Sequence, residues 1–434
     1  MEPGDLLVSW SGTPGTSFGA FVWSGPPGVL NQHIFKCSIF EDYRDFICLA
    51  INSRLDVLID GAHGGVGLQH FTKDKLERLA LAIPPLQEQQ RIVQRVNELM
   101  HVCDDLEQQQ AARTEARSNL TASALNRVTE ALSVADVRAA VRAFAENIGL
   151  HLAPGEGDIA ALNRVRQGIL DIAVRGRLTH QDSAEEPASA LLERITADRA
   201  KLVKSKTIRR SAPPTALDPE TQDFQVPGGW EWCTLGELLI SNEAGWSPVC
   251  PPEPRSSPDQ WGVLKLSAVS WGQFRPREHK VLAAGLEPRP AIEVRDGDYL
   301  MSRANTAALV GRSVVVKDPP PRLMMSDLIV RLGFVDRTTA EYVNVLNGTR
   351  SIRSLYAEAS KGTSDTMRKL SRDQILATPV PLPPLAEQGR IVQRVAKLAA
   401  LCDALEGQLT AARALRADVT ASVAAHVARE RAEA

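Results

Sequence analysis

Cysteine is scarce in this sequence, and its thiols lie far apart. No two of them form a CxxC pair, which excludes the closely spaced ligands of a zinc module and the dense framework of a small disulfide-rich domain. We therefore expect reduced thiols in a cytoplasmic protein. The six cysteines are Cys37, Cys48, Cys103, Cys233, Cys250 and Cys402.

The sequence also lacks a long apolar run. No stretch approaches about 18 uninterrupted apolar residues, and the N-terminus, "MEPGDLLVSW", has no basic segment followed by an apolar one. Neither sign of charge is in clear excess, because the sequence has 50 Lys and Arg and 52 Asp and Glu. We expect a soluble chain that is neither exported nor membrane-spanning, and any nucleic-acid partner would have to bind local patches.

Motifs of self-sufficient DNA enzymes are absent as well. The string nearest to a methyltransferase [DNS]PP[YF] motif is "DPPPR" at 318–322, which lacks the aromatic residue that stacks on a flipped base. There is no G-x-x-x-x-G-K-[ST] phosphate loop and no H-E-x-x-H metal motif. The glycine-rich "DGAHGGVG" at 60–67 lacks G-x-G-x-x-G and is expected to be a surface loop. We expect a noncatalytic chain with no metal or cofactor of its own.

A long repeat is the strongest positive signal. "PPLQEQQRIVQRVNELMHVCDDLE" at 84–107 returns as "PPLAEQGRIVQRVAKLAALCDALE" at 383–406, and 17 of 27 positions are identical between 83–109 and 382–408. Such similarity indicates an internal duplication. The prolines favour a helix that begins at each "PPL". The first helix would continue to about Val128, a length of about 65 Å at 1.5 Å per residue.

Apolar residues in both copies alternate spacings of four and three, which is typical of helices that pack in a coiled coil. We predict that the two copies pack against each other, in an antiparallel pair with pseudo-twofold symmetry. Packing in an ordinary helical bundle is the alternative. The predicted packing residues are Ile92, Val96, Leu99, Cys103, Leu106, Ile391, Val395, Leu398, Cys402 and Leu405.

The duplication extends weakly upstream of both helices. Three segments recur in the same order, and the alignment places His33 opposite Asp327, for both of which we expect a structural role. Each half is therefore predicted to be a mixed α/β module followed by a long helix, with one scaffold carrying two different surfaces. The aligned pairs are "GDLLVSWSGT" (4–13) with "GDYLMSRANT" (297–306), "QHIFKC" (32–37) with "SDLIVR" (326–331), and "FTKDKLERLALAIPPL" (71–86) with "LSRDQILATPVPLPPL" (370–385).

The two modules differ in extent. Nothing in residues 1–83 corresponds to 226–296, so the first module lacks nearly half the length of the second. We expect a truncated gene or a start codon assigned too far downstream. Between the modules, "ALNRVRQGILDIAVRGRL" (161–178) and the segment at 185–206 are predicted helices, followed by a polar, proline-containing linker at 208–224.

These segments together resemble the specificity subunit of type I restriction-modification enzymes. The residues that carry the resemblance are the repeated P-P-L-x-E-Q helix, "RQGILDIAVRGRLTHQDSAEEPASALLERI" and "GGWEWCTLGELL". The resemblance implies an α+β fold with two mixed α/β target-recognition domains, separated by long antiparallel coiled-coil helices. It also implies a bipartite double-stranded DNA target. Methyltransferase subunits and a restriction/translocase subunit would dock on the chain, and they would use S-adenosylmethionine, ATP and Mg²⁺.

The resemblance and the repeat together predict five segments. Family members carry two full recognition domains, so the shortened first module departs from the pattern and leaves its reading of a half-site in doubt. The predicted segments are a partial first target-recognition domain at 1–83, a first long helical spacer at 84–153, a central helical region and linker at 154–221, a second target-recognition domain at 222–381 and a second long helical spacer at 382–434.

DNA reading needs cations for phosphates and polar side chains for base edges. Basic residues gather in "WGQFRPREHK" (271–280) and "SKGTSDTMRKLSR" (360–372), whereas tryptophans such as Trp271 are interpreted as core or loop anchors. A helical scaffold, an inactive remnant and a self-sufficient endonuclease or methyltransferase remain alternative functions. The predicted DNA-contacting residues are Arg275, Arg303, Asn305, Lys361, Thr363 and Arg368 in the second module and Ser11, Thr13, His63 and Gln69 in the first.

Overall fold

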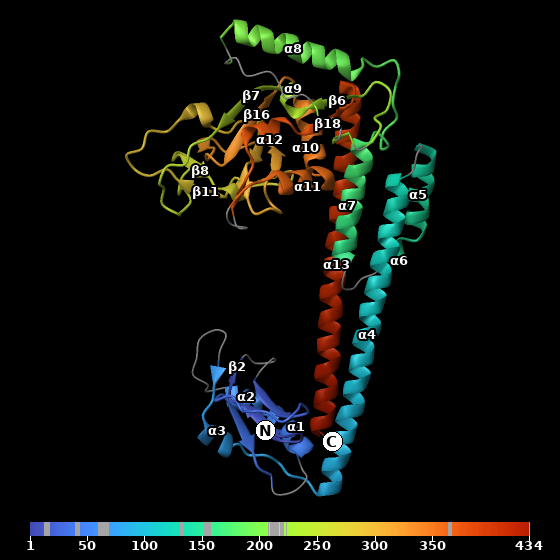
Figure 1. Cartoon of the computed structure of the whole chain (residues 1–434), viewed down its shortest axis with the longest axis vertical. Helices are drawn as coiled ribbons and strands as arrows, with labels where there is room; N and C mark the ends of the chain where they lie inside the picture. The colour runs from blue at the N-terminus through green and yellow to red at the C-terminus, as the bar shows by residue number, and fades with distance from the viewer. Residues whose placement is uncertain are drawn as a thin grey trace. The chain divides into compact units, whose positions relative to one another are not determined.

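The chain divides into two compact units, residues 1–113 and 114–434 (Figure 1). Secondary structure and contacts are taken from a computed structural model. It describes residues 1–12, 18–39, 44–59, 69–130, 134–151, 158–206, 208, 217, 221–222, 224–362 and 367–433.

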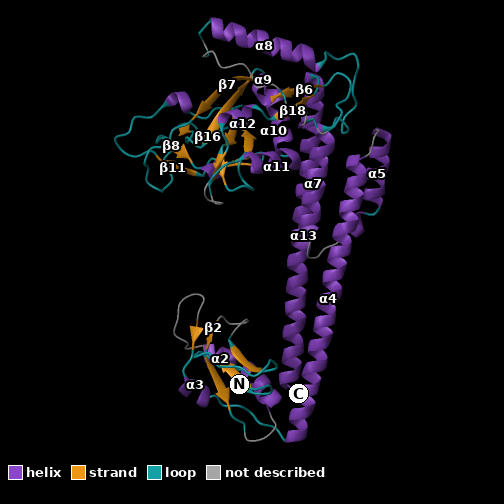
Figure 2. Cartoon of the chain, viewed as in Figure 1, coloured by secondary structure: helices purple, strands orange, loops and turns teal. Residues whose placement is uncertain are grey.

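An antiparallel four-stranded sheet forms the centre of the second unit (Figure 2). Strand β12 is buried along its whole length, and its side chains alternate between two apolar clusters. Tyr299 and Met301 face the cluster that includes helix α10, whereas Leu300 faces the other cluster. Both faces of the sheet are therefore covered. In sheet order the strands are β14 (Ser313–Val315), β12 (Tyr299–Ser302), β16 (Ile329–Phe334) and β7 (Leu239–Ala244), and α10 is Arg337–Asn347.

Smaller sheets extend this module. One has the order β11-β8-β15, with β15 parallel to β8, and the others are two-stranded pairs. The strands of the three-stranded sheet are β8 (Gly262–Leu264), β11 (His279–Val281) and β15 (Leu323–Met324). The two-stranded pairs are β9 (Val269–Ser270) with β10 (Gln273–Phe274), β13 (Ala304–Asn305) with β17 (Arg368–Lys369), and β6 (Glu231–Thr234) with β18 (Pro379–Leu382).

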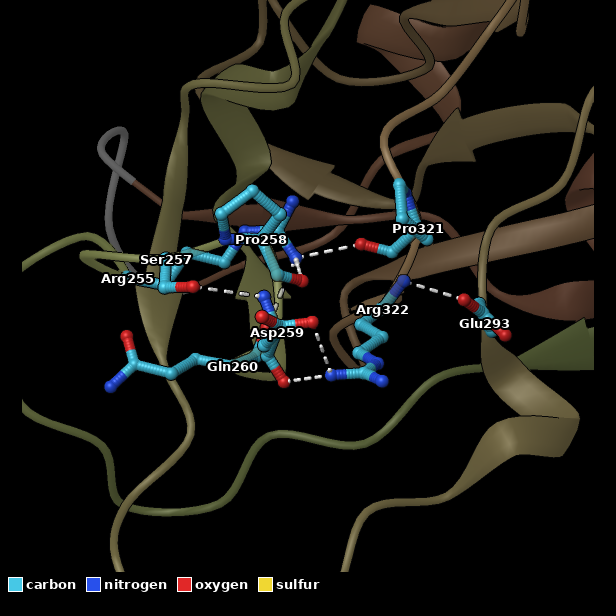
Figure 3. Close-up of polar contacts among 8 residues, drawn as sticks. All are labelled: Arg255, Ser257, Pro258, Asp259, Gln260, Glu293, Pro321 and Arg322. Carbon is cyan, nitrogen blue, oxygen red and sulfur yellow. Dashed lines mark hydrogen bonds and ion pairs between the residues drawn. The ribbon is translucent and has the colours of Figure 1, made fainter.

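Two arginines fix the loop that precedes β8 (Figure 3). The Nη1 atom of Arg255 donates to the backbone oxygens of Gln260 at 3.0 Å and Pro321 at 2.7 Å. Arg322 pairs with Asp259 and donates its backbone N–H to Glu293 at 2.5 Å. These charge-assisted bonds hold the loop against the residues that lead into β15.

Long helices flank the second module. Helix α13 packs against α7 and α10, and Figure 1 shows α7 running alongside α13. Arg166 of α7 pairs with Asp403 and Glu406 of α13, both at 2.7 Å, whereas the end of α7 leads to residues that contact Glu387. The two helices are therefore antiparallel. The bounds are α7 (Asp158–Val174), α8 (Ala188–Lys204) and α13 (Leu385–Glu433).

Shorter helices complete the second unit. Their packing includes His151, which stacks on Phe144 with ring centroids 4.3 Å apart and lies 3.2 Å from the hydroxyl of Thr121. Burial lowers the pKa of His151, so the stacked ring favours its neutral form. The helices are α5 (Val134–Glu146), α6 (Ile148–His151), α9 (Leu235–Leu238), α11 (Arg350–Ala359) and α12 (Arg372–Leu376), with 3-10 turns at Leu266–Ala268 and Pro290–Ile292.

The first unit is a smaller α/β module followed by the first part of a long helix, which ends in the second unit. Its antiparallel sheet has the order β3-β1-β4, and Leu6 and Val8 are buried in its core. Helix α4 has 45 residues, about 68 Å at 1.5 Å per residue, which agrees with the predicted length. The elements are β1 (Leu6–Ser9), β2 (Ser11–Gly12), β3 (Gly19–Val22), β4 (Ile34–Cys37), α1 (Arg44–Asn52), α2 (Leu55–Ile59), β5 (Gln69–His70), α3 (Lys73–Glu77) and α4 (Leu86–Glu130).

The sheets of the two modules are copies of one another, with a correction to the alignment. In the first module Ser9 pairs with Ile34, and in the second Ser302 pairs with Ile329. The sequence alignment had placed Ile34 opposite Leu328, one residue too early. The backbone N–H of Trp10 donates to His33 at 3.1 Å, as that of Arg303 donates to Leu328 at 2.9 Å, so the counterpart of His33 is not Asp327.

Side-chain contacts support the corrected register. Lys36 pairs with Asp5 at 2.6 Å, and at the equivalent places Arg331 pairs with Asp298 at 3.0 Å. The two modules therefore share an ion pair between the same two strands. Asn52 and Asn347 also match. The side-chain amide of Asn52 bonds to the backbone of Ala20 in β3, and that of Asn347 donates to the backbone oxygen of Gly311, just before β14.

Candidate nucleic-acid interface

Four of the predicted DNA-contacting residues converge in the second module. Asn305 of β13 pairs with Arg368 of β17. The backbone oxygen of Arg303 accepts the N–H of Leu370 at 2.9 Å, which extends this ladder. Lys361 pairs with Lys369 through backbone bonds of 3.1 and 2.9 Å. The structure thus joins residues from two distant stretches of sequence in one polar surface, the β13–β17 surface, defined by Arg303, Asn305, Lys361 and Arg368.

The side chains of this surface use only part of their hydrogen-bonding capacity within the chain. Lys361 is exposed, and the other three are half-buried. The side-chain oxygen Oδ1 of Asn305 accepts a hydrogen bond from the backbone N–H of Thr306 at 2.9 Å. The side-chain nitrogen Nδ2 can then donate to an external acceptor. The buried Nε of Arg303 has no hydrogen-bond partner among the described residues. Amide and guanidinium groups held in this way can bond to base edges and phosphates.

The first module builds the same strand pair with different side chains. Ser11 pairs with His70 and Gly12 with Gln69, while Phe71 donates to the Trp10 oxygen at 3.1 Å. By these bonds Trp10, Gly12 and Gln69 occupy the positions of Arg303, Asn305 and Arg368. Gln69 therefore lies at the backbone position of Arg368, whereas Ser11 lies at that of Ala304, and DNA contact by either residue stays a prediction. Thr13, His63 and Thr363 lie outside the described residues.

Arg275 lies elsewhere in the second module, after the β9–β10 hairpin. Its guanidinium donates from Nε and Nη2 to the Gln273 side chain at 3.2 and 3.1 Å. Two cations that the sequence analysis did not single out lie nearby. Arg353 of α11 stands over the Trp271 ring, 4.8 Å from its centroid, and Arg312 directly precedes β14. Only the turn contacts of the folded chain reveal this grouping, because the three arginines are far apart in sequence.

The predicted helix-packing stripe is buried in the second copy. Ile391 and Val395 belong to the apolar core that includes α10 and the end of α7, and Cys402 is 4% exposed. Leu398 and Leu405 are half-buried. The heptad spacing alone did not indicate that α7 and α10 would cover this stripe.

In the first copy Ile92 and Val96 are half-buried and Cys103 is exposed. Leu99 and Leu106 are 47% and 58% exposed. Pairing of the two copies with each other stays a prediction.

The two helix entrances also differ in their surroundings. Glu387 is 1% exposed and accepts bonds from Trp230 Nε1 at 2.8 Å, Thr179 Oγ1 at 2.9 Å and Gln181 Nε2 at 3.0 Å. Its copy, Glu88, is half-buried and pairs with Arg91 at 2.5 Å. The same residue type therefore organises the core in one module and lies at the surface in the other.

A cavity opens beside the start of α4 in the first unit. It has a volume of about 510 Å³ and lies between α1 and the start of α4, lined among others by Phe46, Gln89, Val93 and His101. In the second module the matching part of α13 packs directly against α10. Among the described residues of the chain, no group of three or more His, Cys, Asp or Glu could hold a metal ion.

Comparisons with known proteins agree with this geometry. Residues 2–116 match the family model of the type I restriction modification DNA specificity domain. The EcoEI specificity subunit of Escherichia coli is 35% identical over 394 residues, which cover 89% of this chain and 65% of that subunit. The chain resembles the specificity subunits of type I restriction enzymes. The family resemblance inferred from the repeated helix is thus confirmed.

Two further relatives extend the resemblance. The EcoAI specificity subunit of Escherichia coli is 36% identical over 178 residues, or 40% of this chain and 29% of that subunit. A solved chain, from work on complex assembly and conformational transition of the type I R-M system, has a TM-score of 0.50 at 16% identity and covers 97% of this chain and 79% of its own. That likeness supports the mixed helix-and-strand fold with long helices. The chain spans about two thirds of the length of the EcoEI subunit.

The described helices contain none that is both long and apolar enough to cross a membrane. All six cysteines are free thiols.

Proposed function

We propose that this chain is a noncatalytic specificity subunit, which recognises a bipartite double-stranded DNA target and directs methyltransferase and restriction subunits to it. The observation that carries the proposal is the similarity to the EcoEI specificity subunit along 89% of the chain. The duplicated module adds to it, because two copies of one scaffold with different side chains at equivalent places suit two different half-sites.

The β13–β17 surface supplies suitable chemistry for the second half-site. Arginine can bond a guanine edge with two parallel hydrogen bonds, and an asparagine amide can do the same to adenine. Arg303, Arg368 and Asn305 lie on neighbouring strands, so they can reach adjacent base pairs in one groove, while Lys361 neutralises a phosphate. In the first module Ser11 and Gln69 would read the other half-site by hydrogen bonds without a positive charge.

The chemical steps belong to partner subunits in this proposal. S-adenosylmethionine would serve the methyltransferase subunits, and ATP and Mg²⁺ would serve the restriction/translocase subunit. This chain, acting in the cytoplasm, would contribute position and sequence choice alone. The proposal assigns the long helices the role of a spacer between the half-sites, with the five predicted segments as its working parts.

The decisive experiment uses the purified full chain with DNA, Mg²⁺ and S-adenosylmethionine. We expect no cleavage and no methyl transfer without partners, together with a salt-dependent preference for particular sequences in a pool of random duplexes. Cleavage or methylation by the chain alone would replace the proposal with a self-sufficient enzyme. Binding that ignores sequence would favour a scaffold or an inactive remnant.

A second experiment tests the spacer role. Insertion of four residues within 110–125 of α4 adds about 6 Å of helix. We expect the reconstituted methyltransferase to modify a target with a longer gap between its half-sites. An unchanged target on methylation mapping would refute the spacer.

A further inference from the structure

A tight hairpin brings three arginines together in the second module. Strands β9 and β10 are joined by a two-residue turn, Trp271-Gly272, and Gly272 has a φ of +66°, which suits glycine. The backbone N–H of Gly272 donates to the oxygen of Ser313 at 2.9 Å. The turn is therefore anchored at the first residue of β14, immediately after Arg312.

Arg353 and Arg275 complete the group from two other directions. The Arg353 guanidinium lies over the Trp271 ring at 4.8 Å, within the range of a cation–π contact that limits its movement. The backbone N–H of Arg275 donates to Ala268 at 2.9 Å, so this residue extends the same hairpin. Helix, hairpin and strand thus present one guanidinium each around the Trp271-Gly272 turn.

No described carboxylate neutralises the three charges. Among the residues that the structure describes, none of the three forms an ion pair with a carboxylate, and the buried Nε of Arg312 has no hydrogen-bond partner. Partial burial, together with the positive charges of Arg275 and Arg353, lowers the pKa of Arg312. Elsewhere in the module arginines are neutralised, as Arg337 is by Asp296 at 2.8 Å and Glu341 at 3.2 Å. An external anion would relieve the repulsion among the three.

We propose that Arg275, Arg312 and Arg353, arranged around the Trp271-Gly272 turn, form a phosphate-binding site for the backbone of duplex DNA. This inference rests on the proposed function and names a subsite of it. The three guanidinium groups, of which those of Arg275 and Arg353 are held by Gln273 and Trp271, match phosphate oxygens, which guanidinium binds in pairs. Stacking on Trp271 fixes Arg353 in place, and an arginine fixed in this way positions a duplex without reading its sequence.

The first module has no such site at the equivalent backbone positions. Gly19 matches Arg312 by strand register, and Leu58 matches Arg353 by its place in the helix after the asparagine cap. The described part of that module has no counterpart of the β9–β10 hairpin. The two described positions of the first module that match Arg312 and Arg353 therefore carry no positive charge.

The test measures DNA affinity of the full chain as a function of salt. The slope of log K against log salt is negative, and each lost phosphate contact lowers its magnitude by about 0.9. We expect R312Q and R353Q each to lower the slope by about this amount and to weaken binding equally for all sequences. R353K retains a positive charge and is expected to keep most of the slope.

R337Q is the matched control, because it removes the same charge from an arginine that is already neutralised. It should leave the slope unchanged. Thermal unfolding of each variant establishes that the module remains folded. A wild-type slope in R312Q, R353Q and the double variant would overturn the phosphate-binding site while DNA binding itself persists. Absence of any DNA binding by the wild-type chain would overturn the proposed function as well.

Discussion

Trp10, Gly12 and Gln69 in the first module occupy the backbone positions at which the second module carries Arg303, Asn305 and Arg368. The strands around these positions pair in the same register in both modules. The comparison separates two demands on the sequence. Positions that set the pairing keep their character, while positions at the end of the sheet differ in charge and size, which agrees with the proposal that the two modules recognise different targets.

The same comparison holds inside the scaffold. The ion pair between Asp5 and Lys36 recurs between Asp298 and Arg331, although lysine has replaced arginine. Glu88 and Glu387, in contrast, are identical residues with different surroundings, because Trp230 bonds to only one of them. Burial is therefore decided by elements outside the repeat.

The largest expected effect concerns these two glutamates. E387A removes the acceptor of the buried Trp230 indole and one acceptor of the half-buried Thr179 and Gln181 side chains, and an unsatisfied buried group costs about 1–3 kcal/mol. We expect a loss of about 3 kcal/mol or more in the free energy of unfolding, measured by urea denaturation with tryptophan fluorescence. E88A is the matched variant and should change it by less than about 0.5 kcal/mol. Equal losses would show that the two helix entrances are packed alike.

Asparagine caps give a smaller and more even effect. Asn347 is 3% exposed and donates to Gly311 and Ser313, both at 2.7 Å. N347A should cost about 1–3 kcal/mol because two acceptors in the core lose their donor. N52A removes the two bonds to Ala20, each 2.8 Å long, and should destabilise its own module in the same range. Hydrogen exchange of the β3 amides measures the stability of the first module, and that of the β14 amides measures the stability of the second. If only one of the two variants lost protection in its own module, the two asparagines would not be equivalent.

The smallest effect is a local titration in the first module. The hydrogen bond from Lys36, followed by the backbone N–H of Glu2, lowers the pKa of Asp5. A folded pKa below the unfolded one means that the interaction stabilises the protein above the unfolded pKa and is lost as the pH falls through the folded pKa. K36Q should raise the pKa of Asp5 towards its ordinary value, as followed by carboxyl carbon shifts. An unchanged pKa of Asp5 in K36Q would show that the backbone N–H of Glu2, and not Lys36, lowers this pKa.

Sequence reasoning predicted the long helices from their heptad spacing and a mixed α/β module before each of them. It did not predict which strands pair. It placed β4 one residue out of register, since Ile34 fits opposite either Leu328 or Ile329 by apolar character alone. A one-residue slip exchanges the two faces of a strand, and the match of Lys36 with Arg331 was the signal that would have corrected it.

The sequence singled out Arg275, but it did not indicate that Arg312 and Arg353 lie beside it around Trp271. Their proximity depends on one backbone bond from Gly272 to Ser313 and on the packing of α11 against the hairpin. Neither contact leaves a periodic signal. The β13–β17 surface was accessible to sequence reasoning because small hydroxyl, amide and basic residues cluster there within short stretches.

The central claim is that the second module reads base sequence through the β13–β17 surface. Selection of random duplexes by the full chain, compared with the N305A/R368A variant, tests it most directly. The account predicts that the wild-type chain enriches a defined sequence and that the variant loses about 1–3 kcal/mol of discrimination at one or two base pairs within it. Enrichment of the same sequence by both proteins would contradict the claim.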